Sequence, residues 1–216
     1  MTYVDRIIER LPADALVAGD PVVDVQRDEG GVTVVNLSGR SERFDAVVMA
    51  THADVSLSLL TDADSAERKA LGLFEYTTND VVLHTDESLL PRHSRARGSW
   101  NVETDDCRQP GNQLVMSYWM NNLPRLDTEA QYLTSVNPGD RVPDEKVIVS
   151  RPMSHPKYTF DTLDGQAALG SLQGHRRTYY AGAHLGYGFH EDGCRSGFQA
   201  AEMIAKSAVQ PVPVAA

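Results

Sequence analysis

The segment 179–197 constrains the fold more than any other part of this sequence. It reads YYAGAHLGYGFHEDGCRSG, in which a short apolar run precedes four glycines and a helix-forming stretch. This order predicts a strand over 178–181, a glycine-rich loop over 182–193 and a helix over 195–208. Glycines let backbone N–H groups approach a ligand, and a helix start favours negative charge. Local physics alone supports an anion-binding turn or, equally, a turn that only serves packing.

Residues 1–60 have the pattern of an α/β block. Apolar residues at helical spacing predict a helix over 3–11. Apolar runs separated by turn residues predict strands over 21–25, 32–37 and 44–50. The run AVVMA at 46–50 has no polar alternation, which indicates a strand buried on both faces of a parallel sheet.

Residues 61–175 have a different texture. A helix is expected over 62–73, and short apolar runs then alternate with loops rich in Pro, Gly, Asn and Asp. These runs predict an antiparallel sheet, with strands near 80–84, 98–102, 113–119 and 146–149. Residues 176–208 return to the first texture, and the tail 209–216 is expected to be loose. The predicted fold class is mixed α/β.

Charge and composition exclude several classes of function. Lys and Arg number 20 against 30 Asp and Glu, which gives a formal net charge of −10. Nucleic acids and anionic membranes attract basic surfaces, so neither is an expected partner. Two cysteines match neither a disulfide framework nor a zinc site. No signal peptide or transmembrane run is visible, so we expect a cytoplasmic protein.

Several motifs resemble those of a known family. Ala181-Gly-Ala, Gly188-Phe-His-Glu-Asp-Gly and Ser196-Gly resemble the C-terminal flavin-binding motif of flavin-containing amine oxidoreductases. Stretches at 50–53, 82–86, 90–92, 99–101 and 118–121 are similar to a bacterial FAD/NAD-binding subgroup often encoded near cyclopropane-fatty-acid synthase-like genes. The resemblance implies FAD as cofactor, and hydride transfer to or from flavin N5 as the chemistry.

The chain departs from this family at one point. Family members begin with a strand and a Gly-x-Gly-x-x-Gly turn for the FAD pyrophosphate, and no such spacing occurs here. The chain therefore resembles the C-terminal part of a Rossmann-like FAD-binding fold with an antiparallel-sheet substrate domain, without its N-terminal half. On this resemblance, 1–60 are the second part of the FAD-binding domain, 61–175 the substrate domain, and 176–208 the closing strand, loop and helix.

The resemblance implies FAD contacts in two early segments and in the loop. Val23 matches a position whose backbone contacts the adenine. Ala50 and Thr51 end the apolar strand and are expected beside the dinucleotide. Gly182 and Ala183 match the loop near the ribityl chain and the pyrophosphate.

The start of the last helix supplies the remaining expected contacts. Asp192, Gly193 and Cys194 match a helix start that faces the pyrimidine side of the flavin, where reduced flavin carries negative charge. Gly188 belongs to the same motif, and His190 is expected to be structural or to face the flavin. Gly197 is expected to permit close packing of this helix.

Other chemistry-bearing residues have simpler interpretations. His184 and His190 with the neighbouring acids show no metal-ligand spacing, so no metal is expected. His84 and Asp86 share a strand face, and a structural role is favoured over a substrate contact. The aromatic residues Trp100, Tyr118 and Trp119 could line a substrate pocket or form a sheet core.

Two hypotheses of different class remain open, besides a binding module with no redox role. The first is an FAD-dependent oxidoreductase that acts on a small-molecule or lipid-like substrate. The second is a non-catalytic remnant, or a subunit that needs a separate N-terminal FAD-binding half. Half of a sheet exposes an unpaired edge and an apolar face, which favours association.

Overall fold

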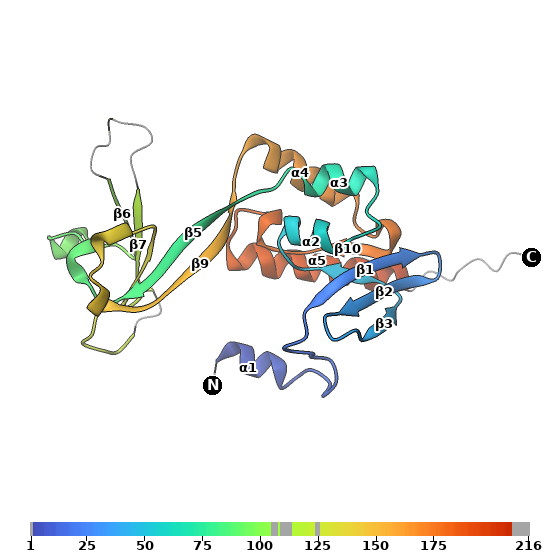
Figure 1. The fold of residues 1–216 in the computed structure, drawn as a ribbon, viewed down its shortest axis with the longest axis horizontal. Coiled ribbons are helices and arrows are strands. Elements are labelled where there is room, and N and C mark those ends of the chain that lie inside the picture. The colour runs from blue at the N-terminus through green and yellow to red at the C-terminus, as the bar shows by residue number, and fades with distance from the viewer. Residues whose placement is uncertain (1, 105–107, 109–113, 124–125, 209–216) are drawn as a thin grey trace, which may run out of the picture. The chain divides into compact units, whose positions relative to one another are not determined.

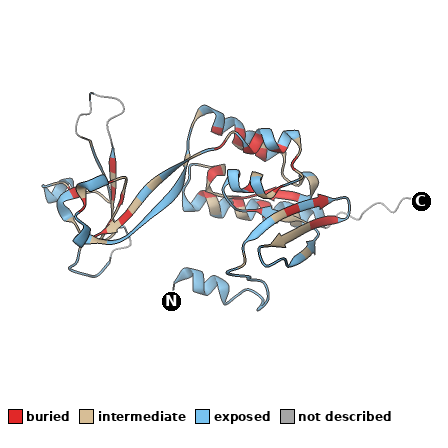
Figure 2. Ribbon diagram, viewed as in Figure 1, coloured by how far each residue is buried: buried red, intermediate tan, exposed pale blue. Residues whose placement is uncertain are grey.

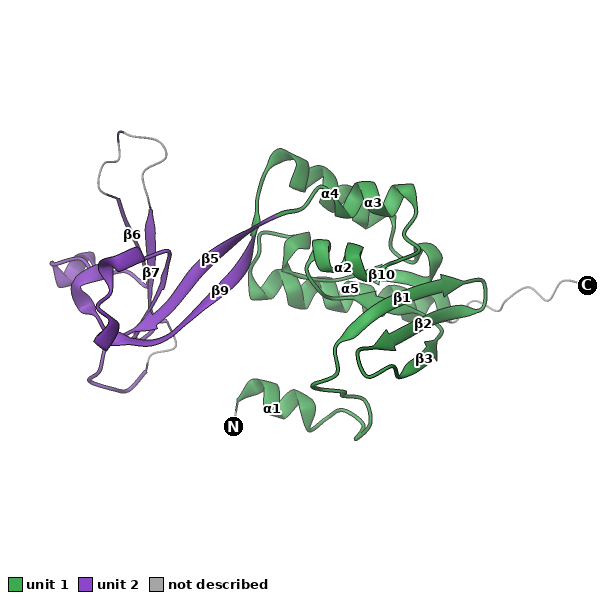
Figure 3. Ribbon diagram, in the orientation of Figure 1, with its two compact units in different colours: residues 1–75, 156–216 green, residues 76–155 purple. Residues whose placement is uncertain are grey.

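The computed structural model describes residues 2–104, 108, 114–123 and 126–208 (Figure 1). The tail 209–216, predicted to be loose, lies outside the described residues. The chain forms two compact units, coloured separately in Figure 3. Unit 1 comprises residues 1–75 and 156–216, and unit 2 comprises residues 76–155. No helix in the described ranges is long and apolar enough to cross a membrane.

Unit 1 contains a small antiparallel sheet. Its strands are β1 (Val22–Asp28), β2 (Gly31–Asn36) and β3 (Ser41–Phe44), in that order. Asp28 Oδ1 accepts hydrogen bonds from the backbone N–H groups of Gly30 and Gly31, at 2.7 and 3.0 Å, and so closes the first hairpin. Helix α1 (Tyr3–Ile8) precedes the sheet, and none of its residues is buried (Figure 2).

A two-stranded parallel sheet forms the centre of unit 1. It pairs β4 (Val47–Met49) with β10 (Thr178–Tyr180). Helix α5 (His190–Ala208) packs on one face, where Ala200 joins the core formed by Tyr179 and Ala181. The other helices of the unit are α2 (Ala53–Leu59), α3 (Ser65–Leu71) and α4 (Phe160–Ser171).

A buried cluster of charged groups connects β1, α3 and β10. The Arg27 guanidinium donates to both Glu67 carboxylate oxygens, and to Thr178 Oγ1 at 2.9 Å. It also donates to Asp62 Oδ1, and Tyr180 Oη donates to Glu67 Oε1 at 3.1 Å. Burial raises the pKa of the Tyr180 phenol, with the Glu67 carboxylate acting in the same direction. Since the cluster is fully hydrogen-bonded, it fixes three distant segments to one another.

Unit 2 is built on a five-stranded sheet with the order β6-β7-β8-β5-β9. The strands are β5 (Glu75–His84), β6 (Trp100–Glu103), β7 (Val115–Trp119), β8 (Leu133–Val136) and β9 (Val147–Lys157). Buried side chains on this sheet form a core with the loops that cover it: Leu89, Leu90, Val115, Leu133 and Val142. Short 3₁₀ turns lie at Glu87–Leu89, Ser94–Ala96, Gly139–Arg141 and Asp144–Lys146 here, and at His175–Arg177 and Ala183–Leu185 in unit 1.

The predicted mixed α/β class is confirmed, as is the parallel sheet, but several element boundaries differ. The run predicted as one strand over 44–50 divides between β3 and β4. Val48 is 39% exposed, so the prediction of burial on both faces is wrong for this strand. Helices α2 and α4 and strand β8 were not predicted, and unit 2 is shorter at both ends than the predicted middle block 61–175. Helices α3 and α4 pack together in unit 1, which explains that difference.

Candidate functional site

The carboxyl ends of β4 and β10 bring two predicted segments together. The strands are parallel neighbours, and the Ala181 N–H donates to the Met49 carbonyl at 3.1 Å. Ala50 and Thr51 follow β4, while Gly182 and the glycine-rich loop follow β10. The two segments therefore leave the sheet at the same edge. In open parallel sheets, ligands bind at this edge.

The loop after β10 starts with a conformation that only glycine adopts readily. Gly182 has φ 151° and ψ 160°, and a Cβ atom there would lie 2.6 Å from the His184 ring. Ser196 on α5 accepts the Gly182 N–H at 2.9 Å, and its hydroxyl lies 2.9 Å from the Gly193 carbonyl oxygen. The start of the loop is thus bound directly to the first turns of α5.

Asp192 holds the other end of the loop. Helix α5 begins at His190, five residues before the predicted start, so Asp192 lies in its first turn. The carboxylate of Asp192 accepts the N–H groups of Tyr187 and Phe189, at 3.0 and 3.1 Å, and pairs with Arg195. The bond from the Phe189 N–H contributes most to lowering the pKa of Asp192. The side chain is 6% exposed and committed to the loop, so it shapes the site rather than presenting a free carboxylate.

Several backbone donors at this edge are unused within the described residues. Among these residues, no hydrogen bond engages the N–H groups of Ala183 and His184, whereas those of Gly182 and Leu185 are bonded. A Cβ on Gly193 would lie 3.7 Å from the Ala183 nitrogen, so the loop and the start of α5 approach closely. The first N–H groups of a helix, here at His190 and Glu191, have no acceptor within the helix. These groups can donate to an anion or to an electron-rich oxygen.

Val23 lies at an irregularity of β1. The register of β1 against β2 shifts between Val22 and Asp24, so Val23 is the extra residue of a β-bulge. A bulge leaves one residue outside the ladder of hydrogen bonds. The Val23 side chain is 45% exposed. The backbone contact predicted at Val23 stays a prediction.

The remaining predicted residues lie around the helix start. Gly188, His190 and Cys194 are exposed. Gly188 has φ 89°, and a Cβ atom there would lie 2.7 Å from the Tyr158 hydroxyl. At Gly197 a Cβ would meet nothing within 4 Å, so the prediction that this glycine permits close packing is wrong. Its position on α5 is open and would accept a larger residue.

His184 lies beneath the loop and is 6% exposed. Its ring meets the ring of Phe74 edge to face, with centroids 5.1 Å apart. Burial lowers its pKa to about 4, and the nearby His52 acts in the same direction. In the ranges that the structure describes, no group of three His, Cys, Asp or Glu side chains is arranged to hold a metal ion.

Two glutamines support the loop, and sequence reasoning missed both. Gln166 on α4 donates to the carbonyls of His184 and Gly186, at 3.0 and 2.7 Å. The Gln173 amide accepts the N–H of Tyr180 at 2.9 Å and donates to its carbonyl at 3.0 Å. No sequence signature marks such a glutamine, because its amide can bind any backbone group that the fold places next to it.

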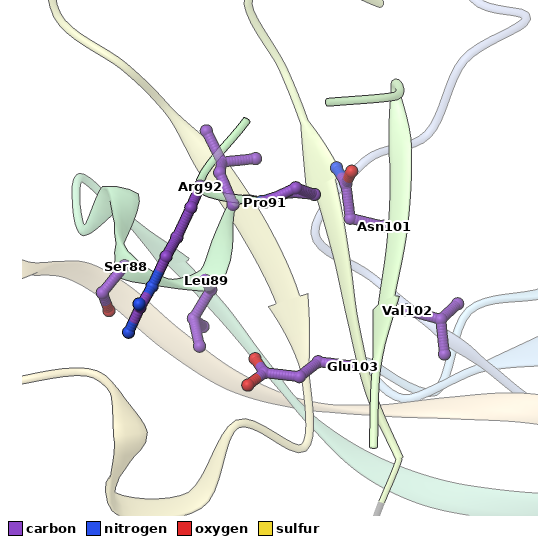
Figure 4. Close-up of a pocket in the computed structure, with 8 residues that line it drawn as sticks. Ser88, Leu89, Pro91, Arg92, Asn101, Val102 and Glu103 are labelled. Carbon is purple, nitrogen blue, oxygen red and sulfur yellow. The ribbon is translucent and has the colours of Figure 1, made fainter. Parts of the chain in front are cut away.

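Unit 2 has a separate cavity of about 330 Å³ (Figure 4). Its lining mixes apolar and charged side chains from the loop after β5 and from β6: Ser88, Leu89, Leu90, Pro91, Arg92, Asn101, Val102 and Glu103. His84 is fully buried nearby in the sheet and lies 2.8 Å from Ser135 Oγ, which supports a structural role. Trp100 is 54% exposed and packs edge to face on Tyr118, whereas Trp119 packs against the core.

Unit 1 thus has a parallel sheet that ends in a glycine-rich loop and a helix start, and unit 2 has an antiparallel sheet. The family model described as flavin containing amine oxidoreductase matches residues 2–205. The chain therefore belongs to the flavin-containing amine oxidoreductase family.

Solved structures with the same fold have low sequence identity to this chain. Cyclohexylamine oxidase from Brevibacterium oxydans IH-35A is 16% identical with a TM-score of 0.66, and the match covers 95% of this chain and 52% of that one. A CLA-producing fatty acid isomerase from P. acnes is 15% identical with a TM-score of 0.56, and the match covers 87% of this chain and 47% of the isomerase. Reduced UDP-galactopyranose mutase is 12% identical with a TM-score of 0.62, and the match covers 95% of this chain and 51% of the mutase.

This chain spans about half the length of these solved proteins. No curated protein matches the sequence. The structural likeness therefore establishes the fold, and the family model establishes the family.

Proposed function

We propose that this chain forms part of an FAD-dependent oxidoreductase, with FAD bound at the shared carboxyl edge of β4 and β10. The observation that carries the proposal is the unused Ala183 N–H, which lies beside Gly193 at the start of α5. Ala50 and Thr51 lie at the same edge, and the bulged backbone at Val23 offers a further contact. The chain's membership of a flavin-containing family supports this choice of cofactor.

The residues at this edge fit a dinucleotide. The Ala183 N–H and the first N–H groups of α5 can donate to the cofactor, since the Asp192 carboxylate is engaged by Tyr187, Phe189 and Arg195. The other acid of this first turn, Glu191, is exposed. When bound, the flavin supplies hydride transfer at N5. The chain's own contribution is to hold the cofactor and to place the positive end of the α5 dipole beside its negative charge.

The substrate class that we propose is small and lipid-like. One solved protein with this fold is a fatty acid isomerase, which supports a lipid-like substrate. Other proteins with this fold include cyclohexylamine oxidase, so an amine is the competing substrate class. Turnover assays with unsaturated fatty acids and with primary amines distinguish the two.

A second candidate is a subunit or a non-catalytic remnant that does not bind FAD alone. The fact that favours it is the half-length match to the solved proteins, together with the lack of a Gly-x-Gly-x-x-Gly turn. His190, Glu191 and Cys194 at the tip of α5 are exposed, so the described residues form one side of the FAD site. We propose that a separate N-terminal half supplies the other side.

The substitution Ala183→Pro tests the site. It removes the unused N–H and no hydrogen bond within the described residues, and the preceding Gly182 has a ψ angle that proline tolerates. We expect FAD affinity to fall at least tenfold in any complex that binds FAD, with the melting temperature preserved. Equal FAD affinity of the variant would contradict the proposed contact.

A further inference from the structure

The cavity of unit 2 lies between the loop that follows β5 and the edge strand β6 (Figure 4). Its volume of about 330 Å³ falls within the range of small-molecule sites, about 300–1,000 Å³. Leu89 and Leu90, which are 8% and 4% exposed, belong to the core of this unit and give the cavity an apolar floor. All proposed FAD contacts belong to unit 1, whereas every residue that lines this cavity belongs to unit 2.

Hydrogen bonds within the loop hold one wall of the cavity in shape. The Asp86 carboxylate accepts the N–H of Ser88 at 3.2 Å and its hydroxyl at 2.6 Å. The Arg97 guanidinium donates to the Pro91 carbonyl at 3.0 Å and pairs with Glu87 at 3.4 Å. A wall that is fixed before binding loses little conformational entropy when a ligand arrives.

Arg92 lines the cavity and carries a charge that no nearby acid neutralises. The acids close to it each have a partner: Asp86 with Ser88, Glu87 with Arg97, and Glu103 with Arg141 at 3.6 Å. Within the described residues, no hydrogen bond or ion pair engages Arg92, and its side chain is exposed. A guanidinium in this state can bind a carboxylate through two parallel hydrogen bonds.

The edge of β6 adds backbone groups to the cavity. The Trp119 N–H donates to the Ser99 carbonyl, so the backbone of Ser99 faces β7. Backbone groups alternate in direction along a strand, and the N–H and carbonyl of Val102 therefore point away from β7. No strand in the described part of the chain pairs with this side of β6. The Val102 side chain points away from the loop in Figure 4, so its backbone is the part that faces the cavity.

We propose that this cavity is a second ligand site, which takes a small monocarboxylate with an apolar body. Arg92 binds the carboxylate, and the Val102 N–H is a further donor at the same cavity. The apolar body packs on Leu89 and Leu90, and its removal from water supplies affinity. Binding here is independent of FAD, because no lining residue belongs to the cofactor edge.

An ammonium ligand fits the cavity less well. Glu103 also lines it, but the Arg141 guanidinium lies 3.6 Å from the Glu103 carboxylate and offsets its charge. A cation would have to share Glu103 with Arg141 and would be repelled by Arg92. The amide of Asn101 is engaged on both sides by the backbone of Gly98, at 3.0 and 2.8 Å.

Titration of the full chain with hexanoate, followed by NMR of the Leu89 and Leu90 methyl groups, tests the site. Hexylamine and hexanol are matched probes, because they keep the apolar body and replace the carboxylate by a cation or a neutral group. We expect hexanoate to shift these methyl signals and to bind about tenfold more tightly than either analogue. The lack of a shift with hexanoate, or equal binding of an analogue, would overturn the proposal.

The substitution Arg92→Gln tests the cation directly. Its side chain is exposed and has no partner within the described residues, so the melting temperature should match the wild type. We expect its affinity for hexanoate to fall about tenfold. Arg95→Gln is the matched control, because Arg95 lies in the next turn, is exposed and does not line the cavity. Unchanged affinity of Arg92→Gln, or an equal loss in Arg95→Gln, would contradict a site built around Arg92.

Discussion

Arg27 donates hydrogen bonds to both carboxylate oxygens of Glu67, at 2.5 and 2.9 Å, and the two side chains are 1% and 0% exposed. Arg27 lies on β1, four residues after the bulge at Val23, and Glu67 lies on α3. Thr178 and Tyr180, which hydrogen-bond to this pair, lie on the strand that leads into the glycine-rich loop. The pair thus sets the position of one proposed cofactor contact relative to another.

Removing one partner of this pair should destabilise the protein strongly. Arg27→Met leaves the Glu67 carboxylate buried with weaker compensation, and breaking a buried pair in this way costs about 3–5 kcal/mol. Urea unfolding monitored by circular dichroism measures the loss. In the double variant Arg27→Met, Glu67→Leu the loss should be smaller than the sum of the two single losses. Additive losses would show that the two side chains do not act as a pair.

Two glycines of the loop and helix should respond oppositely to alanine. Gly182→Ala forces a Cβ to within 2.6 Å of the His184 ring at φ 151°, and we expect a loss of about 1–3 kcal/mol. Gly197→Ala is the matched control, because its Cβ meets nothing within 4 Å and alanine favours the helix by about 0.5–1 kcal/mol. Melting temperatures of the two variants provide the comparison. A stable Gly182→Ala protein would contradict the strained start of the loop.

The free energy of unfolding should decrease as the pH is lowered, because His184 takes up a proton more readily in the unfolded state. Burial lowers the pKa of folded-state His184 to about 4 from the ordinary histidine value of 6.5, so the unfolded state binds the proton first. The contribution is complete above pH 6.5 and is lost as pH falls toward 4, amounting to about 3 kcal/mol. His184→Phe should reduce this slope in urea unfolding measured at several pH values. Because burial also lowers the pKa of His84, a part of the slope should remain. An unchanged slope would exclude a neutral, buried His184.

Asp192 should control the order of the loop. Asp192→Asn weakens its bonds to the N–H groups of Tyr187 and Phe189 and removes its pairing with Arg195. We expect faster deuterium exchange at these two amides, with exchange in β10 unchanged. The same bonds lower the pKa of Asp192. In the wild type, the protection of the Tyr187 and Phe189 amides from exchange should therefore persist above pH 3.8 and weaken as the pH falls below this value. Unchanged amide exchange in the variant would contradict this role.

The strand, loop and last helix were predictable because their signals are local. Apolar residues before 182, glycines within the loop and helix formers after it occur in sequence order. Helix α4 was not predicted, since it contains Gly165 and Gly170. The structure explains Gly165, because a Cβ there would lie 2.7 Å from the Phe74 ring. A packing constraint of this kind cannot be seen until both elements are in place.

The buried polar groups were not predictable for a different reason. Arg27 and Glu67 are 40 positions apart and, taken singly, look like ordinary surface residues. Gln166 binds the loop and Gln173 binds the backbone of β10, and sequence patterns did not reveal either role. The family resemblance predicts a cofactor contact at Ala183, but the lack of a hydrogen bond to its N–H within the described residues is visible only in the folded backbone.

Equilibrium titration with FAD, followed by flavin absorbance and fluorescence, tests the central claim most directly. The titration should use the chain alone, the chain with a separate N-terminal half that contains a strand followed by Gly-x-Gly-x-x-Gly, and the same complex carrying Ala183→Pro. The account predicts weak or no binding by the chain alone, tight binding by the complex and at least tenfold weaker binding by the variant complex. A stable complex that binds no FAD, or one that binds FAD equally well with Ala183→Pro, would contradict a flavin site at the edge of β4 and β10.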